Sequence, residues 1–220
     1  MKKLFLIAMI LTLGIVNGQE KNSKKIITKD SWFISGGFTI NSENEKINSN
    51  LGNNSPDVNK FGFGIAPETG IFIDDNLAIG LGIGYSYSKN QNVNNYNRND
   101  KAHVFSFSPF IKKYFSVSKN LLLSVKGELT YSSIKSKSEF RDYNSFNYRT
   151  YRTNGNSFDI GIRPGLSYFV SKSIALEANL GFLGYKTTSF ENDSDNKNIT
   201  NKFDFNINAS NIVFGITCYM

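Results

Sequence analysis

The stretch LAIGLGIGYSYS, residues 77–88, decides the fold. Every second residue from Leu77 to Tyr87 is large and apolar, and each residue between them is Ala, Gly or Ser. Alternation with a period of two is typical of a β-strand whose two faces meet different surroundings. One face of this strand is suited to an apolar contact, and the other is suited to a narrow space filled by small side chains.

The same alternation recurs along most of the chain. The apolar faces carry Phe, Ile, Leu and Tyr, while the opposite faces carry Gly, Ala, Ser and a few charges. Besides residues 77–88, the alternating segments are residues 32–40, 61–71, 104–112, 121–131, 158–168, 174–182 and 211–220. The sequence therefore predicts an all-β chain, an eight-stranded antiparallel up-and-down β-barrel with both termini at one end.

The connections between these segments alternate between short and long. Tight turns are predicted at residues 74–76, 116–120 and 170–173. Long polar loops are predicted at residues 41–60, 89–101, 133–156 and 186–202. Short turns at one end and long loops at the other are typical of a transmembrane β-barrel with periplasmic turns and extracellular loops.

A soluble secreted ligand-binding barrel is the rival architecture. Its apolar face would point inward, and its solvent face would favour Lys, Glu, Thr and Gln over the runs of Gly seen here. An eight-stranded barrel has room inside only for side chains, which suits the small face. The sequence therefore favours the membrane barrel, with the aromatic-rich face toward lipid.

Composition excludes several classes of protein. The chain has 220 residues, a formal net charge of +7 and a mean hydropathy of −0.31, which argues against a helical membrane protein. The single Cys218 excludes an internal disulfide framework and zinc clusters built on Cys pairs. No nucleic-acid partner is expected, because an exported chain without a basic helix or groove motif lacks the usual footprint.

The N-terminus predicts a signal peptide. Lys2 and Lys3 precede an apolar run over residues 4–16, which is too short to span a bilayer as a helix. Gly18 then supplies the small residue of a cleavage site. We expect a cleaved signal peptide at residues 1–18, a periplasmic N-terminal tail at residues 19–30 and the barrel at residues 31–220. The expected location is the cell outer membrane.

Two strand ends resemble a known family. Residues 109–115, PFIKKYF, and residues 163–169, RPGLSYF, look like strand ends of the bacterial outer-membrane β-barrel domain family. This family is common in Bacteroidota and similar in size to the outer membrane protein X and protein A barrels. The resemblance covers almost the whole chain beyond the signal peptide. It implies insertion by the barrel assembly machinery through the C-terminal strand, although Met220 replaces the usual aromatic terminal residue.

Six charged residues fall on the small face of the predicted strands, three of each sign. Unpaired charges in a packed interior would cost several kcal/mol each, so we expect these side chains to pair and form a structural plug. A gated passage for small solutes, as in a porin, is the alternative. The predicted interior charge cluster is Glu68, Lys112, Lys126, Glu128, Arg163 and Glu177.

The fifth of the predicted connections, residues 133–156, mixes cations with aromatic residues. At the outer rim of a barrel, this mixture suits contact with anionic lipopolysaccharide headgroups. A solvated loop whose charges pair with one another is the alternative. The predicted contacts are Lys135, Lys137, Arg141, Arg149 and Arg152.

Catalysis, cofactors and metal ions are not expected. A small outer-membrane enzyme needs a base near a nucleophile, but His103 faces outward while Ser106 faces inward. The acidic residues 191–195 lack the glycine and closing glutamate of an EF-hand loop. The predicted function is a structural or surface-interaction role through the extracellular loops, with lipid, lipopolysaccharide and an unknown extracellular partner.

Irregularities in the pattern predict local distortions. Pro67, Pro109 and Pro164 lie on outward positions before the short turns, and we expect a bulge at each because proline cannot donate to a strand ladder. Apolar residues occupy odd positions over 203–207 and even positions from Ile212 onward. Either a bulge near residues 209–211 restores the phase, or residues 203–207 protrude above the membrane. Alternating aromatic residues at positions 146 and 148 and at 203 and 205 also predict that the strands around residues 133–156 and 186–202 extend beyond the bilayer.

Overall fold

The computed structural model describes residues 25–46, 57–92, 98–141, 147–192, 197–206 and 212–220. No helix among them is long and apolar enough to cross a membrane. The predicted signal peptide and residues 19–24 of the predicted tail lie outside the described residues. The described strands are β1 (Trp32–Lys46), β2 (Asp57–Asp74), β3 (Leu77–Asn92), β4 (Arg98–Ser116), β5 (Leu121–Arg141), β6 (Tyr148–Phe169), β7 (Ile174–Leu180), β8 (Phe182–Asn192), β9 (Lys197–Asn206) and β10 (Ile212–Tyr219).

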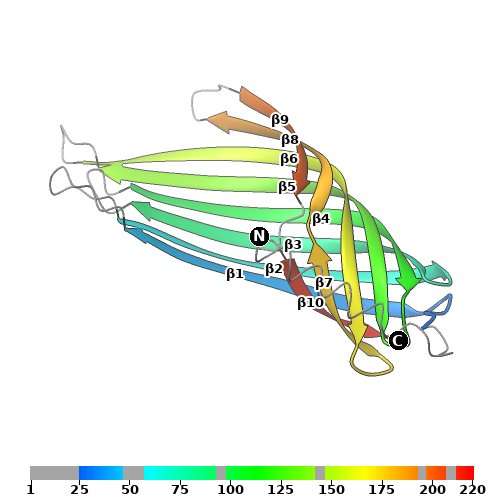
Figure 1. Cartoon of the computed structure of the whole chain (residues 1–220). Coiled ribbons are helices and arrows are strands. Elements are labelled where there is room, and N and C mark those ends of the chain that lie inside the picture. Colours follow the sequence, from blue (N-terminus) through cyan, green and yellow to red (C-terminus); the bar gives the residue numbers. More distant parts are fainter. Residues whose placement is uncertain (1–24, 47–56, 93–97, 142–146, 193–196, 207–211) are drawn as a thin grey trace.

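These strands form a closed antiparallel ring with eight positions. β1 to β6 pair in chain order, β6 pairs with β7, β7 with β10, and β10 with β1 (Figure 1). β8 continues the seventh position beyond Gly181 and pairs with β6, and β9 pairs with β8. The up-and-down barrel predicted from the sequence is confirmed, with the seventh and eighth strands each divided in two.

The apolar face of each strand points outward. Leu81 is 49% exposed, while Ala78 on the opposite face of the same strand is fully buried. A soluble barrel would show the reverse arrangement, so the soluble alternative is wrong. We call this outward surface the apolar belt; its exposed members include Ile34, Phe38, Ile40, Ile65, Ile79, Leu81, Ile83, Phe105, Phe107, Ile111, Leu123, Leu129, Tyr131, Phe158, Ile160, Ile162, Leu176, Leu183, Tyr185, Phe203, Phe205 and Ile216.

The strands continue far beyond the apolar belt. β5 runs to Arg141 and β6 begins at Tyr148, so strand replaces most of the loop predicted at residues 133–156. Phe140 and Tyr151 stack with their ring centroids 5.3 Å apart on this extension. All four long loops are shorter than predicted. The outer parts of the strands are polar on both faces, so their sequences do not alternate between apolar and polar residues. β5 and β6 thus continue past the apolar belt, as the sequence predicts for residues 133–156.

The expected bulges at the three prolines occur at one site only. Strand register is unbroken across Pro67 and Pro109, where ladder pairs are missing but no residue is inserted. Opposite Pro164, the register with β6 shifts by one residue between β7 and β8. Gly181 lies at this shift with φ 103°, a conformation that glycine adopts without strain. A further bulge was predicted near residues 209–211, and these residues lie outside the described part of the chain.

The shift at Gly181 reverses the faces of the strand that follows. Outward positions are even in β7 but odd in β8, where Leu183 and Tyr185 are exposed. Phe182, expected on the outward face, instead lies beneath the Arg163 guanidinium, 4.7 Å from the ring centroid. The expectation for Phe182 was wrong because alternation alone does not reveal an inserted residue.

Among the described residues, the seam between the first and last strands is paired only in its periplasmic half. β1 and β10 pair from Phe33 opposite Tyr219 to Gly37 opposite Gly215. Beyond Gly37, β1 continues beside β2 alone, and β9 pairs with β8 alone among the described residues. Figure 1 shows the β8–β9 hairpin turned away from β1.

The short-turn end of the barrel is filled by aromatic side chains. Phe33 packs against Phe72 and Tyr219 with centroids 5.8 and 6.0 Å apart, and Phe169 lies 5.0 Å from Tyr219. Parity predicts that these side chains point inward, but it does not predict that they gather at one end. We call the cluster the periplasmic core; it comprises Ile27, Phe33, Phe72, Ala78, Phe110, Tyr114, Leu122, Phe169, Ala175 and Tyr219.

Residues 25–30 lie across this end and form a segment that we call the N-terminal strap. The Ile27 N–H donates to Asn76 Oδ1, and the Asn76 N–H donates to the Ile27 carbonyl, each at 2.9 Å. The Lys25 ammonium donates to the carbonyl of Lys172 at 3.2 Å. The strap therefore joins the β2–β3 turn to the β6–β7 turn and buries Ile27 in the periplasmic core.

Candidate functional site

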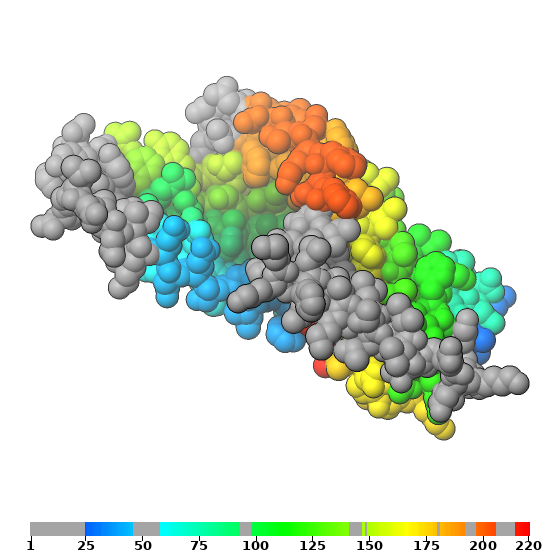
Figure 2. Space-filling model, in the orientation of Figure 1, coloured from blue at the N-terminus to red at the C-terminus, as the bar shows by residue number. Residues whose placement is uncertain are grey.

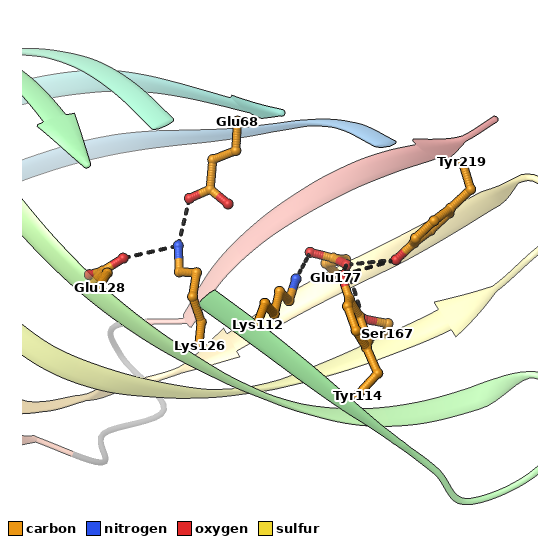
Figure 3. Close-up of polar contacts among 8 residues, drawn as sticks. All are labelled: Glu68, Lys112, Tyr114, Lys126, Glu128, Ser167, Glu177 and Tyr219. Atoms are coloured by element: carbon orange, nitrogen blue, oxygen red, sulfur yellow. Dashed lines mark hydrogen bonds and ion pairs between the residues drawn. The ribbon is translucent and has the colours of Figure 1, made fainter. Parts of the chain in front are cut away.

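The deeper of two interior ion groups surrounds the carboxylate of Glu177. Lys112 Nζ lies 2.7 Å from Glu177 Oε2, and both side chains are buried (Figure 3). Ser167 Oγ donates to Glu177 Oε1 at 3.0 Å, and the Tyr219 hydroxyl lies 3.2 Å from the same oxygen. Four strands therefore contribute to this group, which lies directly above the periplasmic core and carries no net charge.

The upper ion group is built around Lys126. Its ammonium lies 2.6 Å from Glu68 Oε1 and 3.1 Å from Glu128 Oε2 (Figure 3). Arg163 Nε donates to the other oxygen of Glu128. The six charged residues predicted on the inward face thus divide into one pair and one neutral group of four. A further interior acid, Asp159, lies higher, 3.5 Å from Lys186.

A cavity of about 310 Å³ with both polar and apolar lining residues lies above the upper ion group. Hydroxyl groups line it from β1, β3, β4 and β5, and Ser108 Oγ lies 2.9 Å from Thr130 Oγ1. Gly64 and Gly84 leave the space that larger side chains would fill. Within the described residues, the interior is therefore filled by side chains at its periplasmic end and holds a cavity above the ion groups.

A second candidate site lies on the outside, where the belt ends. Outward positions on β3, β4, β5 and β6 stand in register, so each level forms a row across four strands. One row contains Tyr87 opposite His103 and His103 opposite Lys135, and the next row outward is entirely basic. We call that basic row the cationic row; its members, each opposite the next, are Lys89, Lys101, Lys137 and Arg152.

The structure brings together only part of the predicted lipopolysaccharide contacts. Lys137 and Arg152 belong to the cationic row, and Lys135 lies one level below it. Arg149 lies opposite Phe140 farther out on the extension, and the side chain of Arg141 lies outside the described part of the chain. These five residues therefore lie on β5 and β6 and not in one loop. Their contact with lipopolysaccharide stays a prediction.

Two members of the cationic row were missed in the sequence. Lys89 and Lys101 fall in segments predicted as loops, where alternation was not followed. Tyr87 and His103 point outward, and every second residue of a strand lies on the same face. Lys89, two residues after Tyr87, and Lys101, two residues before His103, therefore also lie on the outward face. Their position was therefore readable from parity, whereas their alignment required the strand register.

The carboxylate of Glu139 partly offsets the positive charge at one edge of the cationic row. Lys137 Nζ lies 2.5 Å from Glu139 Oε1. This hydrogen bond and the charge of Lys137 hold the pKa of the Glu139 carboxyl below its usual value. Glu139 therefore stays ionised, and the row and its acid together keep a positive balance.

The remaining candidate residues from the sequence are His103 and Cys218. His103 Nδ1 lies 2.8 Å from the Tyr85 hydroxyl, and its ring is 5.1 Å from that of Tyr87. Cys218 is exposed on the belt near the short-turn end. Within the described ranges, no group of three or more His, Cys, Asp or Glu side chains is placed to hold a metal ion.

A closed antiparallel ring, an apolar belt and a charged, hydroxyl-lined interior define a small transmembrane β-barrel of the outer-membrane type. Its lipid-facing surface would be a large exposed apolar patch in water, but it matches the hydrocarbon of a bilayer. Barrels built in this way belong in a bacterial outer membrane, which is the location that the sequence predicts.

Comparisons with solved structures return proteins of the same class. Neisserial surface protein A shares 14% identity over 89% of this chain and 99% of its own, with a TM-score of 0.35. The attachment invasion locus protein Ail of Yersinia pestis shares 12% over 88% and 100%, with a TM-score of 0.40. A major outer membrane protein from Thermus thermophilus shares 11% over 86% and 99%, with a TM-score of 0.45.

Likenesses this distant say nothing about what the chain binds, and the barrel assignment rests on its own strand pairing and burial. No family model and no curated protein matches the sequence.

Proposed function

We propose that this protein is a non-enzymatic surface barrel that binds the anionic headgroups of lipopolysaccharide through its cationic row. The observation that carries the proposal is the alignment of Lys89, Lys101, Lys137 and Arg152 on four adjacent strands. The row lies two levels above the belt aromatics Tyr85 and Phe105, at the height where lipid headgroups begin.

The chemistry of this level supports the proposal. Adjacent strands are about 4.8 Å apart, so four aligned cations cover about 14 Å along the rim. A basic side chain near an anionic lipid surface contributes about 1 kcal/mol to the attraction. Tyr85, Tyr87 and His103 below the row have the amphipathic rings that suit a membrane interface.

Two further partners belong to the same proposal. The barrel assembly machinery would recognise β10, where Phe214, Ile216 and Cys218 alternate on the exposed face. An extracellular partner would meet the strands that rise above the belt, where β5 and β6 carry exposed aromatic and basic side chains. Neither role involves catalysis, and the porin-like alternative is disfavoured by the filled periplasmic half of the barrel.

The test removes three positive charges from the cationic row and compares the effect on binding with that of removing three positive charges elsewhere. The row variant carries Lys89→Gln, Lys101→Gln and Lys137→Gln. The matched control carries Lys60→Gln, Lys197→Gln and Lys202→Gln, which lower the net charge equally at other outer positions. Both are refolded in detergent, checked for a heat-dependent shift in electrophoretic mobility, and titrated with fluorescent lipopolysaccharide by anisotropy.

The row variant is expected to bind about 100-fold more weakly, because three contributions of about 1 kcal/mol are lost. The control is expected to stay within about threefold of the unmodified protein, since its lysines are scattered. Equal losses in the two variants would reduce the effect to net charge. A row variant that binds as tightly as the unmodified protein would overturn the proposal.

A further inference from the structure

His103 lies on the outward face of β4, one level below the cationic row. It stands opposite Tyr87 on β3 and opposite Lys135 on β5. Lys101, two residues before it on the same face of β4, belongs to the row. Figure 2 shows the outer ends of these neighbouring strands at one end of the molecule, from the cyan of β2 to the light green of β5. His103 is therefore next to the proposed headgroup site.

Two tyrosines of β3 hold the imidazole in place. The Nδ1 atom of His103 lies 2.8 Å from the Tyr85 hydroxyl, and the ring centroid lies 5.1 Å from that of Tyr87. Both tyrosine rings also contact Phe63 on β2, with centroids 6.1 and 5.7 Å apart. His103 is exposed, and within the described part of the chain its other ring nitrogen, Nε2, has no hydrogen-bond partner. An external group can therefore reach Nε2.

The groups around His103 are phenols and cations. Those that face it from β3, β4 and β5 are Tyr85, Tyr87, Lys89, Lys101, Lys135 and Lys137. Glu139, an acid on the same face of β5, lies farther out and is already paired with Lys137. Lysine and tyrosine keep the same charge between about pH 5 and 8, whereas histidine changes charge within that range. His103 is therefore the group in the described part of this surface whose charge follows pH.

We infer that His103 is a further basic group of the headgroup site, and that binding of an anionic lipid is coupled to the uptake of one proton by its imidazole. This inference rests on the proposed function of the cationic row. The proton comes from solvent and adds to the unprotonated ring nitrogen. Both nitrogens of the imidazolium are then donors, so Nδ1 donates to the Tyr85 hydroxyl and Nε2 donates to a headgroup oxygen.

The coupling has a defined sign and size. Two linked binding events strengthen each other by the same factor. One added positive charge near an anionic lipid surface strengthens binding about fivefold. Affinity is therefore expected to rise about fivefold as the pH falls from about 8 to about 5. The pH at which His103 is half protonated is expected to be about 0.7 of a pH unit higher in the complex, which is the same factor.

The first experiment measures affinity at both ends of this pH range, with a lipid whose own charge is constant. The probe is fluorescent phosphatidylglycerol, whose phosphate diester keeps one negative charge throughout. A phosphate monoester would gain a second charge near pH 6 and obscure the effect. Phosphatidylcholine with the same fluorophore, which has no net charge, is the control lipid. The refolded protein in detergent is titrated with each lipid by anisotropy.

Two variants fix the charge at position 103. His103→Gln stays polar and neutral, and at both pH values it is expected to bind phosphatidylglycerol as weakly as the unmodified protein does at high pH. His103→Lys keeps a positive charge and is expected to bind tightly at both pH values. Lys60→Gln removes a charge at another outer position and is expected to retain the fivefold dependence on pH.

The second experiment follows the proton directly. His103 is the only histidine of the chain, so protein prepared without a histidine tag gives a single set of imidazole signals in NMR spectra. The pH titration of these signals is recorded with and without phosphatidylglycerol. The midpoint is expected to rise in the presence of this lipid and to stay unchanged with phosphatidylcholine.

Three results would overturn the inference. A fivefold dependence on pH that persists in His103→Gln would place the titrating group elsewhere. The same dependence with phosphatidylcholine would show that the charge of the headgroup is not involved. An imidazole midpoint that phosphatidylglycerol does not change would show that the ring does not meet the headgroup. The proposed function fails separately, through unchanged lipopolysaccharide binding by the row variant, so the two failures are distinguishable.

Discussion

Gly80 shows how closely the residues inside the barrel approach one another. A β-carbon at this position would collide with the ring of Phe110 and the carbonyl oxygen of Thr69, whereas one at Gly36 would meet nothing within 4 Å. Gly80→Ala is therefore expected to lower the free energy of unfolding by about 1–3 kcal/mol. Gly36→Ala is expected to change it by less than about 0.5 kcal/mol.

Urea-induced unfolding of the two variants in lipid vesicles measures both values. A Gly80→Ala barrel as stable as Gly36→Ala would show that the interior at Gly80 is looser than the structure has it.

The buried pair of Lys112 and Glu177 gives a second prediction at the residue scale. Lys112→Met leaves the Glu177 carboxylate buried without its cation, which is expected to lower the free energy of unfolding by about 3–5 kcal/mol. The double variant with Glu177→Gln removes both charges and is expected to recover most of the loss.

Lys60→Met, which breaks an exposed pair with Glu43, serves as the control and is expected to cost less than about 1 kcal/mol. The same unfolding assay applies to all three variants. Additive losses in the double variant would argue against direct pairing of Lys112 with Glu177.

At this scale, the sequence predicts which charges point inward but not how they group. Parity places all six on one face, whereas the pairing of Lys112 with Glu177 depends on strands that are 65 residues apart in the chain. Phe182 was misplaced because one inserted residue at Gly181 reverses parity. Lys89 and Lys101 were missed because parity was not followed into polar segments.

The N-terminal strap gives the prediction that belongs to the scale of structural elements. Asn76 has φ 58° and holds Ile27 through its side-chain oxygen. Asn76→Gly keeps the backbone conformation and removes the acceptor, while Asn76→Asp keeps both. Loss of one hydrogen bond worth about 1 kcal/mol is expected to raise local opening of the strap about fivefold.

Trypsin cleavage after Lys29 in the refolded protein measures this opening. Faster cleavage is expected in Asn76→Gly and an unchanged rate in Asn76→Asp. Equal rates in Asn76→Gly and the unmodified protein would mean that other contacts hold the strap.

Among the structural elements, the belt strands could be predicted and their outer ends could not. Alternation is strong where one face meets lipid, as in residues 77–88, and it fades where both faces meet water, as beyond Tyr131 in β5. The half-paired seam was also beyond the sequence, because the register of β10 against β1 depends on contacts between the two ends of the chain.

For the whole molecule, the filled periplasmic half predicts a barrel that does not conduct ions. The periplasmic core, the strap and the two ion groups occupy the interior below the cavity. Purified protein in planar lipid bilayers is expected to give no stable conductance steps, with a large porin in the same bilayers as the positive control. Reproducible steps of constant size would favour the porin-like alternative.

The central claim is that the aromatic-rich face of every belt strand meets lipid while the small face lines the interior. Four consecutive positions of β4 test it directly: Phe105 and Phe107 point outward, and Ser106 and Ser108 line the cavity. Nitroxide labels at single cysteines in a Cys218→Ala background report access to oxygen, which is concentrated in lipid, and to a water-soluble nickel chelate.

Oxygen access is predicted to be high at Phe105 and Phe107 and low at Ser106 and Ser108, so that it alternates with a period of two. High access to the nickel chelate at Phe105 and Phe107, or oxygen access that does not alternate, would contradict the barrel as described.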